Sequence, residues 1–274
     1  MAKSRMTVTE YLDKALADSE KAATEDLVFS HKGILYPFTF CNPETFQVLD
    51  SFEVRSDDVI LAGYPKNDTN WLDQILNDST ALAGPQSQGR APPLQRDKVK
   101  IWHCIRLLQE KDRMKELPSR RIITTHLPPQ VLPKSIFNSK AKILLLVRNP
   151  KDTVVSYFHF YNNMPPLPSF NSWNEYFTAF MHGKLCWGSY FDYLIEWNKH
   201  IDDENVMMIT YEEMKENQPL RAKKIADFFG FTLSEEEIQT VVEKSSFKAV
   251  KDKSSQTHGT FGKILFHKVL LREM

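Results

Sequence analysis

The sequence is poor in cysteine and has no excess of either charge. Its three cysteines, Cys41, Cys104 and Cys186, are far apart and form no CxxC pair, which argues against a disulfide framework or a zinc site and favours a reducing compartment. The 35 basic residues balance 35 acidic ones, so no overall field would attract nucleic acid or an anionic membrane. Any anion site must therefore be local, built from a few Lys and Arg side chains and backbone N–H groups.

Signals for export and membrane insertion are also missing. The N-terminus, MAKSRMTVTEYLDKALADSE, lacks the apolar core of a signal peptide. The longest apolar runs, such as 143–147, fall far short of the roughly 20 residues that span a bilayer. With 42% hydrophobic and 26% charged residues, the composition is that of a globular protein with a sizeable core. We therefore expect a soluble, cytoplasmic protein with no membrane partner.

Short apolar strands alternate with amphipathic helices along most of the chain. The patterns predict strands at 58–64, 121–125, 142–147 and 205–210, and helices at 69–76, 99–114, 151–161, 173–181, 187–200, 220–229 and from 234 onward. Gly230 predicts a helix end, and Ser234 with Glu237 predicts a capping box. Uninterrupted apolar strands suit a parallel sheet covered on both faces. The alternation thus predicts one α/β domain over 1–274, with a parallel sheet flanked by helices.

The segment 64–71, YPKNDTNW, joins the first predicted strand to the helix that follows it. At such a junction, backbone N–H groups and the helix dipole favour an anion. Lys66 adds a positive charge and Thr69 adds a hydroxyl. By itself the segment also fits an ordinary strand–helix turn with a solvated lysine, because no GxxxxGK[ST] loop is present. The same absence argues against a P-loop nucleotide kinase.

Two segments resemble motifs of the cytosolic sulfotransferase family. The loop 64–71 is similar to the family's YPKSGTTW, and 148–157, RNPKDTVVSY, is similar to its RNPKDxxVSYY. The resemblance covers roughly 10–80 and 110–268, is poor over 84–110, and is closest to the sixth vertebrate branch. It implies a P-loop-like sulfotransferase fold. It also implies transfer of the sulfuryl group of PAPS (3′-phosphoadenosine-5′-phosphosulfate) to a hydroxyl or amine of a small molecule, with PAP as product and no metal.

The resemblance assigns the donor site residue by residue. It places the phosphosulfate on the loop residues Lys66, Asn67, Asp68, Thr69, Asn70 and Trp71, the 3′-phosphate on Arg148, Ser156 and Lys268, and the adenine region near Tyr211, Ser245 and Phe247. The residues themselves leave plainer roles open. Arg148 would otherwise pair with Asp152 at the surface, and Tyr211 and Phe247 would otherwise be core side chains.

His126 is the candidate general base. Of the eight histidines, only His126 follows a predicted parallel strand directly, at the end where open α/β sheets bind ligands. Histidine has the intrinsic pKa for proton abstraction near neutral pH. Thr125-His126-Leu127 resembles the family's THL segment, whose histidine is the base, and Lys66 would stabilise the bridging oxygen as the bond to sulfur breaks. A packed or solvated histidine is the alternative, and Lys151 is a weaker candidate that fits a solvated charge.

Two features depart from the family pattern and open a second interpretation. Asp68 replaces a glycine in the phosphosulfate loop. A carboxylate about 4 Å from an anionic oxygen costs on the order of 4 kcal/mol at an effective dielectric near 20, unless it points outward or caps the helix. After Phe266 the chain reads HKVLLREM where the family has RKGxxGDWKN, so His267 and Val269 replace Arg and Gly, and the family's dimer-forming segment is not matched. We expect weakened donor binding, and a catalytically impaired isoform is the alternative function.

The acceptor is not specified by the sequence. The aromatic residues Phe40, Trp102, Phe158 and Phe160 would line an apolar acceptor pocket or would belong to the core. A homodimer is compatible with the family, although the segment that forms it there is not matched here.

Overall fold

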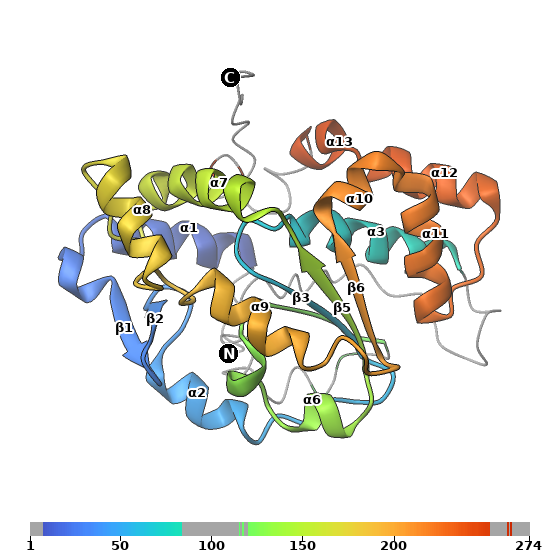
Figure 1. The fold of residues 1–274 in the computed structure, drawn as a ribbon, viewed down its shortest axis with the longest axis horizontal. Helices are drawn as coiled ribbons and strands as arrows, with labels where there is room; N and C mark the ends of the chain where they lie inside the picture. Colours follow the sequence, from blue (N-terminus) through green and yellow to red (C-terminus); the bar gives the residue numbers. More distant parts are fainter. Residues whose placement is uncertain are drawn as a thin grey trace, which may run out of the picture.

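A four-stranded parallel sheet is the centre of the computed structural model, which describes residues 8–83, 115, 117, 120–252, 262 and 264 (Figure 1). The strand order is β4-β3-β5-β6, with β3 at Val59–Gly63, β4 at Ile122–Thr125, β5 at Lys142–Val147 and β6 at Val206–Thr210. Ile60 of β3 is opposite Ile123 of β4 and Ile143 of β5. The four predicted strands and the parallel α/β architecture are confirmed.

The alternation of side chains along the strands divides the core into two halves. Ile60 and Ala62 lie with Ile143 on one face of the sheet, whereas Leu61 lies with Leu144 on the other. Every residue of β3 is buried. Because both faces are apolar, both must be covered, and the helices provide the covers.

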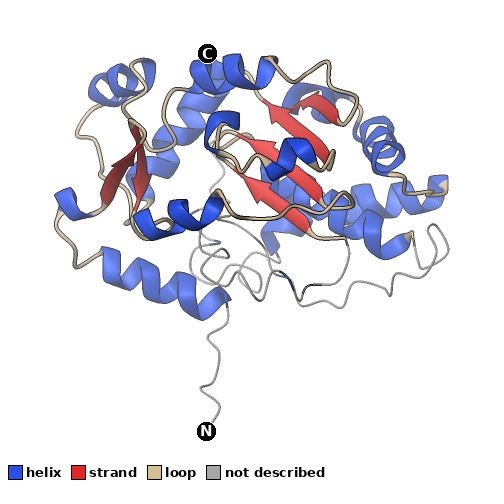
Figure 2. Ribbon diagram, turned by 90° about the horizontal axis from the view of Figure 1, so that it is seen from below, coloured by secondary structure: helices blue, strands red, loops and turns tan. Residues whose placement is uncertain are grey.

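Two groups of helices cover the two faces (Figures 1 and 2). The face of Leu61 is covered by α3 (Thr69–Leu82), α11 (Gln218–Phe229) and α12 (Glu235–Lys244), to the right in Figure 1. The face of Ile60 is covered by α7 (Pro150–Asn163), α8 (Trp173–Met181) and α9 (Tyr190–Asn198), to the left and in front. Other helices are α1 (Val8–Ser19), α2 (Pro43–Leu49), α6 (Ser135–Asn138), α10 (Tyr211–Glu216) and α13 (Phe247–Asp252), and two 3-10 turns are η1 (Thr24–Asp26) and η2 (Pro129–Val131).

A small antiparallel hairpin was not predicted. It pairs β1 (Val28–His31) with β2 (Ile34–Pro37) and stands apart from the main sheet in Figure 2. Its two-residue turn has positive φ at Lys32 (51°) and Gly33 (79°), as the tight hairpin turns require. The Leu35 carbonyl of β2 accepts a hydrogen bond from the N–H of Trp187 at 2.8 Å, which ties the hairpin to the segment before α9.

The helix boundaries follow their capping residues. Gly230 ends α11 in the left-handed conformation, and Ser234 and Glu237 form the predicted capping box of α12. The predicted helix start at 187 was wrong, and α9 begins at Tyr190. The cause is Ser189, whose side chain caps the helix by accepting a hydrogen bond from the Asp192 N–H. The predicted helix 99–114 lies outside the described residues.

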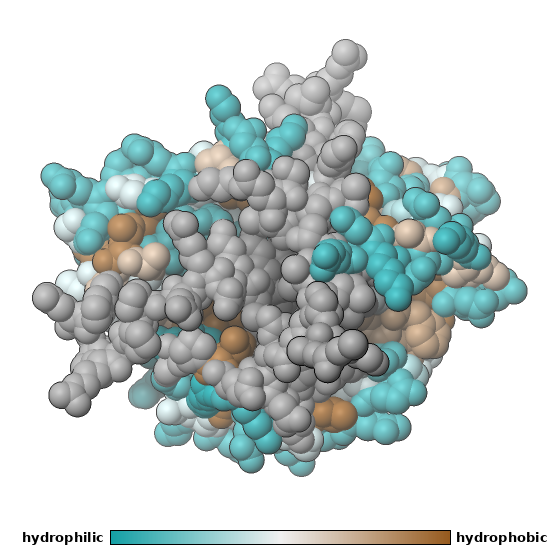
Figure 3. Space-filling view, turned by 180° about the vertical axis from the view of Figure 1, so that it is seen from behind, coloured by the Kyte–Doolittle hydropathy of each residue, from teal (hydrophilic) through white to brown (hydrophobic). Residues whose placement is uncertain are grey.

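Figure 3 shows the face opposite to that of Figure 1, where hydrophilic side chains predominate among the coloured residues and hydrophobic ones form patches among them. Within the described ranges, no helix has both the length and the apolar character needed to cross a membrane.

Candidate active site

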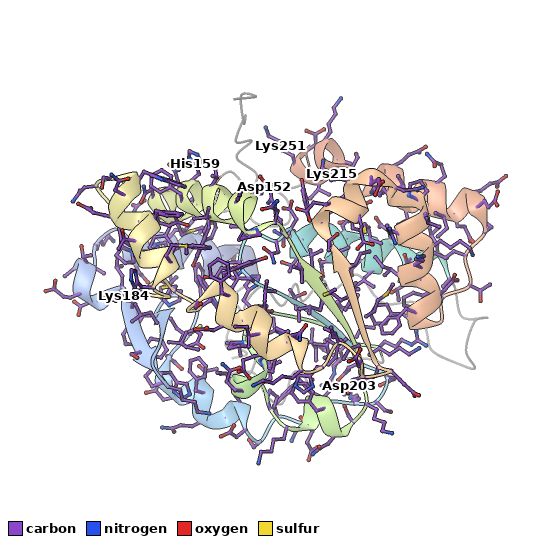
Figure 4. All side chains as sticks on the ribbon, in the orientation of Figure 1. Asp152, His159, Lys184, Asp203, Lys215 and Lys251 are labelled. Atoms are coloured by element: carbon purple, nitrogen blue, oxygen red, sulfur yellow. The ribbon has the colours of Figure 1, made fainter. Side chains whose placement is uncertain are left out.

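Four polar side chains follow the four strands of the main sheet at one edge. Lys66 comes after β3, His126 after β4, Arg148 after β5 and Tyr211 after β6. Because the strands are parallel, their carboxyl ends meet at the same edge, which is where open α/β sheets bind ligands. In Figure 4 the labelled Asp152 on α7 and Lys215 on α10 lie on either side of this edge.

The loop between β3 and α3 is fixed by a buried asparagine. Asn67 is 0% exposed; its Nδ2 donates to the Leu146 carbonyl of β5 at 3.2 Å, and its Oδ1 accepts from the Thr153 hydroxyl of α7 at 3.1 Å. On either side of it, Lys66 and Asp68 have positive φ, at 68° and 65°. Asn67 thus links the loop to β5 and α7 through hydrogen bonds, and its side chain does not face a ligand.

Gly63 allows α3 to start close to the sheet. A Cβ at this position would lie 2.7 Å from the Thr69 Cγ2 and 3.3 Å from the Leu146 carbonyl oxygen. Any larger residue would therefore displace Thr69 at the first turn of α3. Helix geometry leaves the first N–H groups of α3, at Thr69 and Asn70, without partners inside the helix, and such groups bind anions.

Asp68 immediately precedes α3 but does not cap it. Its backbone is left-handed (φ 65°, ψ 37°), and its side chain accepts no hydrogen bond from the helix. One carboxylate oxygen, Oδ2, lies 3.9 Å from Nη1 of Arg148. The side chain of Asp68 is 42% exposed and that of Arg148 is 13% exposed. The carboxylate therefore lies toward the arginine and does not cap the helix.

Lys66 lies between an aromatic ring and the arginine. Its Nζ is 4.9 Å from the centre of the Phe160 ring, and its carbonyl oxygen accepts from Arg148 Nη1 at 2.9 Å. Burial lowers the pKa of Lys66 to about 8; Asp68 opposes this shift and Arg148 adds to it. At neutral pH the ammonium is therefore mostly charged, yet it is less strongly solvated than a surface lysine.

The ring of His126 is held in one tautomer. Nδ1 lies 2.6 Å from the Gly63 carbonyl oxygen. Since a carbonyl can only accept, Nδ1 carries the proton and Nε2 has the free lone pair. Burial lowers the pKa of His126 to about 4, against the effect of the Gly63 carbonyl, and the Lys66 ammonium lowers it further. His126 is thus neutral at pH 7 and able to accept a proton, with the Trp187 ring edge-on at 6.0 Å.

Arg148 packs on the ring of Tyr211, which in turn contacts Trp71. The guanidinium carbon lies 4.3 Å from the centre of the Tyr211 ring, which in turn meets Trp71 edge-to-face at 5.8 Å. Among the described residues Arg148 pairs with Asp68 and not with Asp152, the partner that the alternative interpretation named. Nε of Arg148 and Nε1 of Trp71 are buried with no hydrogen-bond partner in the described part of the chain. Unsatisfied buried donors beside half-buried aromatic rings fit a phosphorylated nucleotide.

The remaining predicted residues fall into three groups. Asn70 and Ser156 are partly buried, in the first turn of α3 and the second turn of α7. Ser245 lies inside the helix packing: it is 0% exposed, donates to the Val242 carbonyl at 3.2 Å and accepts from Gln218 Nε2 at 2.9 Å. The structure does not bring its hydroxyl to the site. The backbone of Phe247 begins α13, whereas its side chain and the whole of Lys268 lie outside the described residues.

Of the aromatic residues considered for an acceptor pocket, Phe160 is the one that lies beside the site residue Lys66. Phe40 is 2% exposed within the core, and Phe158 packs on Trp173 and Tyr176. Trp102 lies outside the described residues. No group of three or more His, Cys, Asp or Glu side chains that would hold a metal ion occurs in the described ranges.

Three contributors to the site were missed by the sequence interpretation. These are the Gly63 carbonyl that fixes His126, the Thr153 hydroxyl that satisfies Asn67, and Trp187 beside the His126 ring. Thr153 carried a usable signal, because it lies in the first turn of a helix that begins next to Arg148. The other two carried none, because each contact joins segments that are distant in the sequence.

Comparison with known proteins gives consistent matches. Residues 56–269 match the sulfotransferase domain family. Sulfotransferase 6B1 of Mus musculus is 46% identical over 259 residues, which cover 94% of this chain and 83% of that protein. Sulfotransferase 6B1 of Gorilla gorilla gorilla is 47% identical over 260 residues, covering 95% and 84%. The crystal structure of mouse sulfotransferase SULT7A1 complexed with PAP is similar, with a TM-score of 0.74 and 30% identity over 89% of this chain and 86% of that chain.

Proposed function

The chain belongs to the sulfotransferase family, in the branch of the 6B1 enzymes, and we propose that it moves the sulfuryl group of PAPS to a hydroxyl or amine of a small-molecule acceptor and releases PAP. The observation that carries the proposal is the arrangement of His126 and Lys66. Nδ1 of His126 is bonded to the Gly63 carbonyl, so Nε2 is left as a base, and Lys66 is near enough to lower the pKa of the ring. A base beside a cation is what this transfer requires.

The donor supplies an activated sulfuryl group, and the residues at the sheet edge would hold it. Lys66 and the first N–H groups of α3, at Thr69 and Asn70, offer positive charge to the phosphosulfate. Arg148 and Ser156 offer charge and a hydroxyl to the 3′-phosphate, because a guanidinium binds phosphate through two parallel hydrogen bonds. Trp71 and Tyr211 offer aromatic surface to the adenine. The buried, unpaired Nε of Arg148 supports this assignment.

His126 and Lys66 would divide the chemistry between them. Nε2 of His126 accepts the proton as the acceptor O–H or N–H bond breaks and the new bond to sulfur forms. Lys66 stabilises the negative charge that collects on the phosphate oxygen as its bond to sulfur breaks. The pKa of about 4 for His126 and of about 8 for Lys66 leave the first neutral and the second mostly cationic at pH 7. Both groups are then in the protonation state that their role requires.

The test is sulfuryl transfer from radiolabelled PAPS to a panel of phenols, alcohols and arylamines, together with PAP binding by calorimetry. His126→Ala should lower kcat by about 100-fold or more while PAP affinity stays within about threefold. His182→Ala, at an exposed histidine just after α8, is the matched control and should behave as the unsubstituted protein. A His126→Ala variant that keeps full activity would refute the assignment of the base.

A second candidate function has one observation in its favour. The Asp68 carboxylate lies beside Arg148, where it opposes the binding of an anion. A chain that binds PAP and transfers no sulfuryl group to any acceptor on the panel would be a donor-binding, catalytically impaired isoform. As to compartment, we propose the cytoplasm, because Cys41 and Cys186 are both buried and no disulfide joins either of them to another cysteine in the described part of the chain.

A further inference from the structure

The backbone at residue 68 requires a left-handed conformation but no charge. At φ 65° and ψ 37°, glycine is the least strained residue, and asparagine and aspartate are the next best tolerated. Because the Asp68 side chain makes no capping bond to α3, the helix gains nothing specific from the carboxylate. The negative charge is therefore an addition to the loop and not a condition of its shape.

The charge lies where anion-binding groups converge. Asp68 Oδ2 is 3.9 Å from Arg148 Nη1, and Asp68 also raises the pKa of Lys66 and of Tyr211. It thus faces two cations and one ring of the proposed donor site at once. At 3.9 Å the pair is too long for a direct hydrogen bond, and with 42% of its side chain exposed the carboxylate can turn toward solvent.

We propose that Asp68 is an internal counter-ion of the donor site, which competes with the phosphates of the donor for Arg148 and Lys66 and so sets how tightly this chain holds the nucleotide. The inference rests on the proposed function, since it assumes that the donor binds at this edge. When the donor binds, its phosphates take over Arg148, and the carboxylate must either turn outward or remain as a repelling neighbour. Either course weakens binding in proportion to the charge of the ligand.

Two variants separate charge from shape. Asp68→Asn keeps the left-handed tolerance and nearly the same volume but removes the charge, whereas Asp68→Gly removes both the charge and the side chain. A full unit charge at about 4 Å and an effective dielectric near 20 corresponds to about a thousandfold in affinity. Because water screens a carboxylate that is 42% exposed, we expect both variants to bind PAP about 10- to 100-fold more tightly.

The experiment is calorimetry at pH 7 with PAP, 5′-AMP and adenosine on the unsubstituted chain, Asp68→Asn, Asp68→Gly and Asp152→Asn. Asp152, at the start of α7, is a carboxylate near the same edge that forms no ion pair with Arg148 in the described part of the chain, so its variant changes net charge without removing the counter-ion. We expect the gain from Asp68→Asn to be largest for PAP, smaller for 5′-AMP and absent for adenosine, and to shrink as salt is raised.

The outcomes distinguish this inference from the proposed function. If the unsubstituted chain binds PAP and Asp68→Asn changes that affinity by less than threefold, the counter-ion role is wrong while the donor site stands. If Asp68→Asn tightens adenosine as much as PAP, or if Asp152→Asn has an equal effect, the contribution is not the local charge and the inference fails. If none of the four proteins binds PAP, the proposed function fails as well.

Discussion

Removing the side chain of Asn67 should loosen the donor loop and destabilise the protein together. Asn67 is completely buried, and its two hydrogen bonds connect the loop to β5 through Leu146 and to α7 through Thr153. In Asn67→Ala both bonds are lost, and the Thr153 hydroxyl loses this acceptor in buried surroundings. The positive φ angles of Lys66 and Asp68 then lose the contact that holds them.

The magnitude follows from the number of bonds and from their burial. Each buried polar group left without its partner costs about 1–3 kcal/mol, so Asn67→Ala should lower the free energy of unfolding by about 2–4 kcal/mol. For a chain of this size that corresponds to a fall in Tm of about 5–12 °C. Thr153→Val removes one of the two bonds and should cost about half as much. The double variant should cost about 1 kcal/mol less than the sum, because the two side chains share a hydrogen bond.

The assay is urea unfolding followed by tryptophan fluorescence, with PAP affinity measured on the folded variants. Asn77→Ala is the matched control, because among the described residues the Asn77 side chain donates to the Asp73 carbonyl of its own helix α3, at 2.6 Å. It should cost under about 0.5 kcal/mol. If Asn67→Ala lowered the free energy of unfolding as little as this control, the hydrogen bonds of Asn67 would not be what holds the loop, and the proposed role of Asn67 would be refuted.

Two further predictions concern the same edge. The kcat/KM of the enzyme should rise with pH as His126 loses its proton near pH 4 and fall as Lys66 loses its proton near pH 8. In Asp68→Asn the alkaline limb should move to lower pH, because a carboxylate that raises the Lys66 pKa is removed; an unmoved limb would assign it to another group. Gly63→Ala should lower stability by about 1–3 kcal/mol, as seen by calorimetric unfolding, because its Cβ would lie 2.7 Å from the Thr69 Cγ2. Adding Thr69→Ser, which deletes that methyl group and keeps the hydroxyl, should restore part of the loss, and no recovery would show that the Leu146 carbonyl is the obstacle.

The strands could be predicted because their signal is local. An apolar run such as 143–147 indicates a buried parallel strand without knowledge of its neighbours, and the capping box of Ser234 lies within four residues. The hairpin of β1 and β2 was missed although its Lys32-Gly33 turn is a usable signal, because its strands are only four residues long. Short strands carry too few alternations to stand out from a loop.

The residues of the candidate site could be predicted from the sequence only in part, and their contacts could not be predicted. The order of strands and loops is enough to place His126 and Arg148 at the same edge of a parallel sheet. Their partners come from far along the chain: Gly63 lies 63 residues from His126, and Asn67 lies 79 from Leu146 and 86 from Thr153. Nothing in the sequence around 67 indicates that this side chain is buried. The family's loop pattern instead suggested that it faces the ligand.

The shape and the charge of the donor loop are therefore set by different residues. Two non-glycine residues in the left-handed region, Lys66 and Asp68, cost roughly 1–3 kcal/mol each, and they persist only where the surroundings impose them. Here the buried hydrogen bond from Asn67 to the Leu146 carbonyl holds the loop, and Arg148 supports the loop by donating to the Lys66 carbonyl. Because Arg148 both supports the loop and is proposed to bind phosphate, replacing it would disturb shape and affinity together. The Asp68 side chain makes no capping bond to α3, so we expect that replacing it can change donor affinity while the fold is left intact.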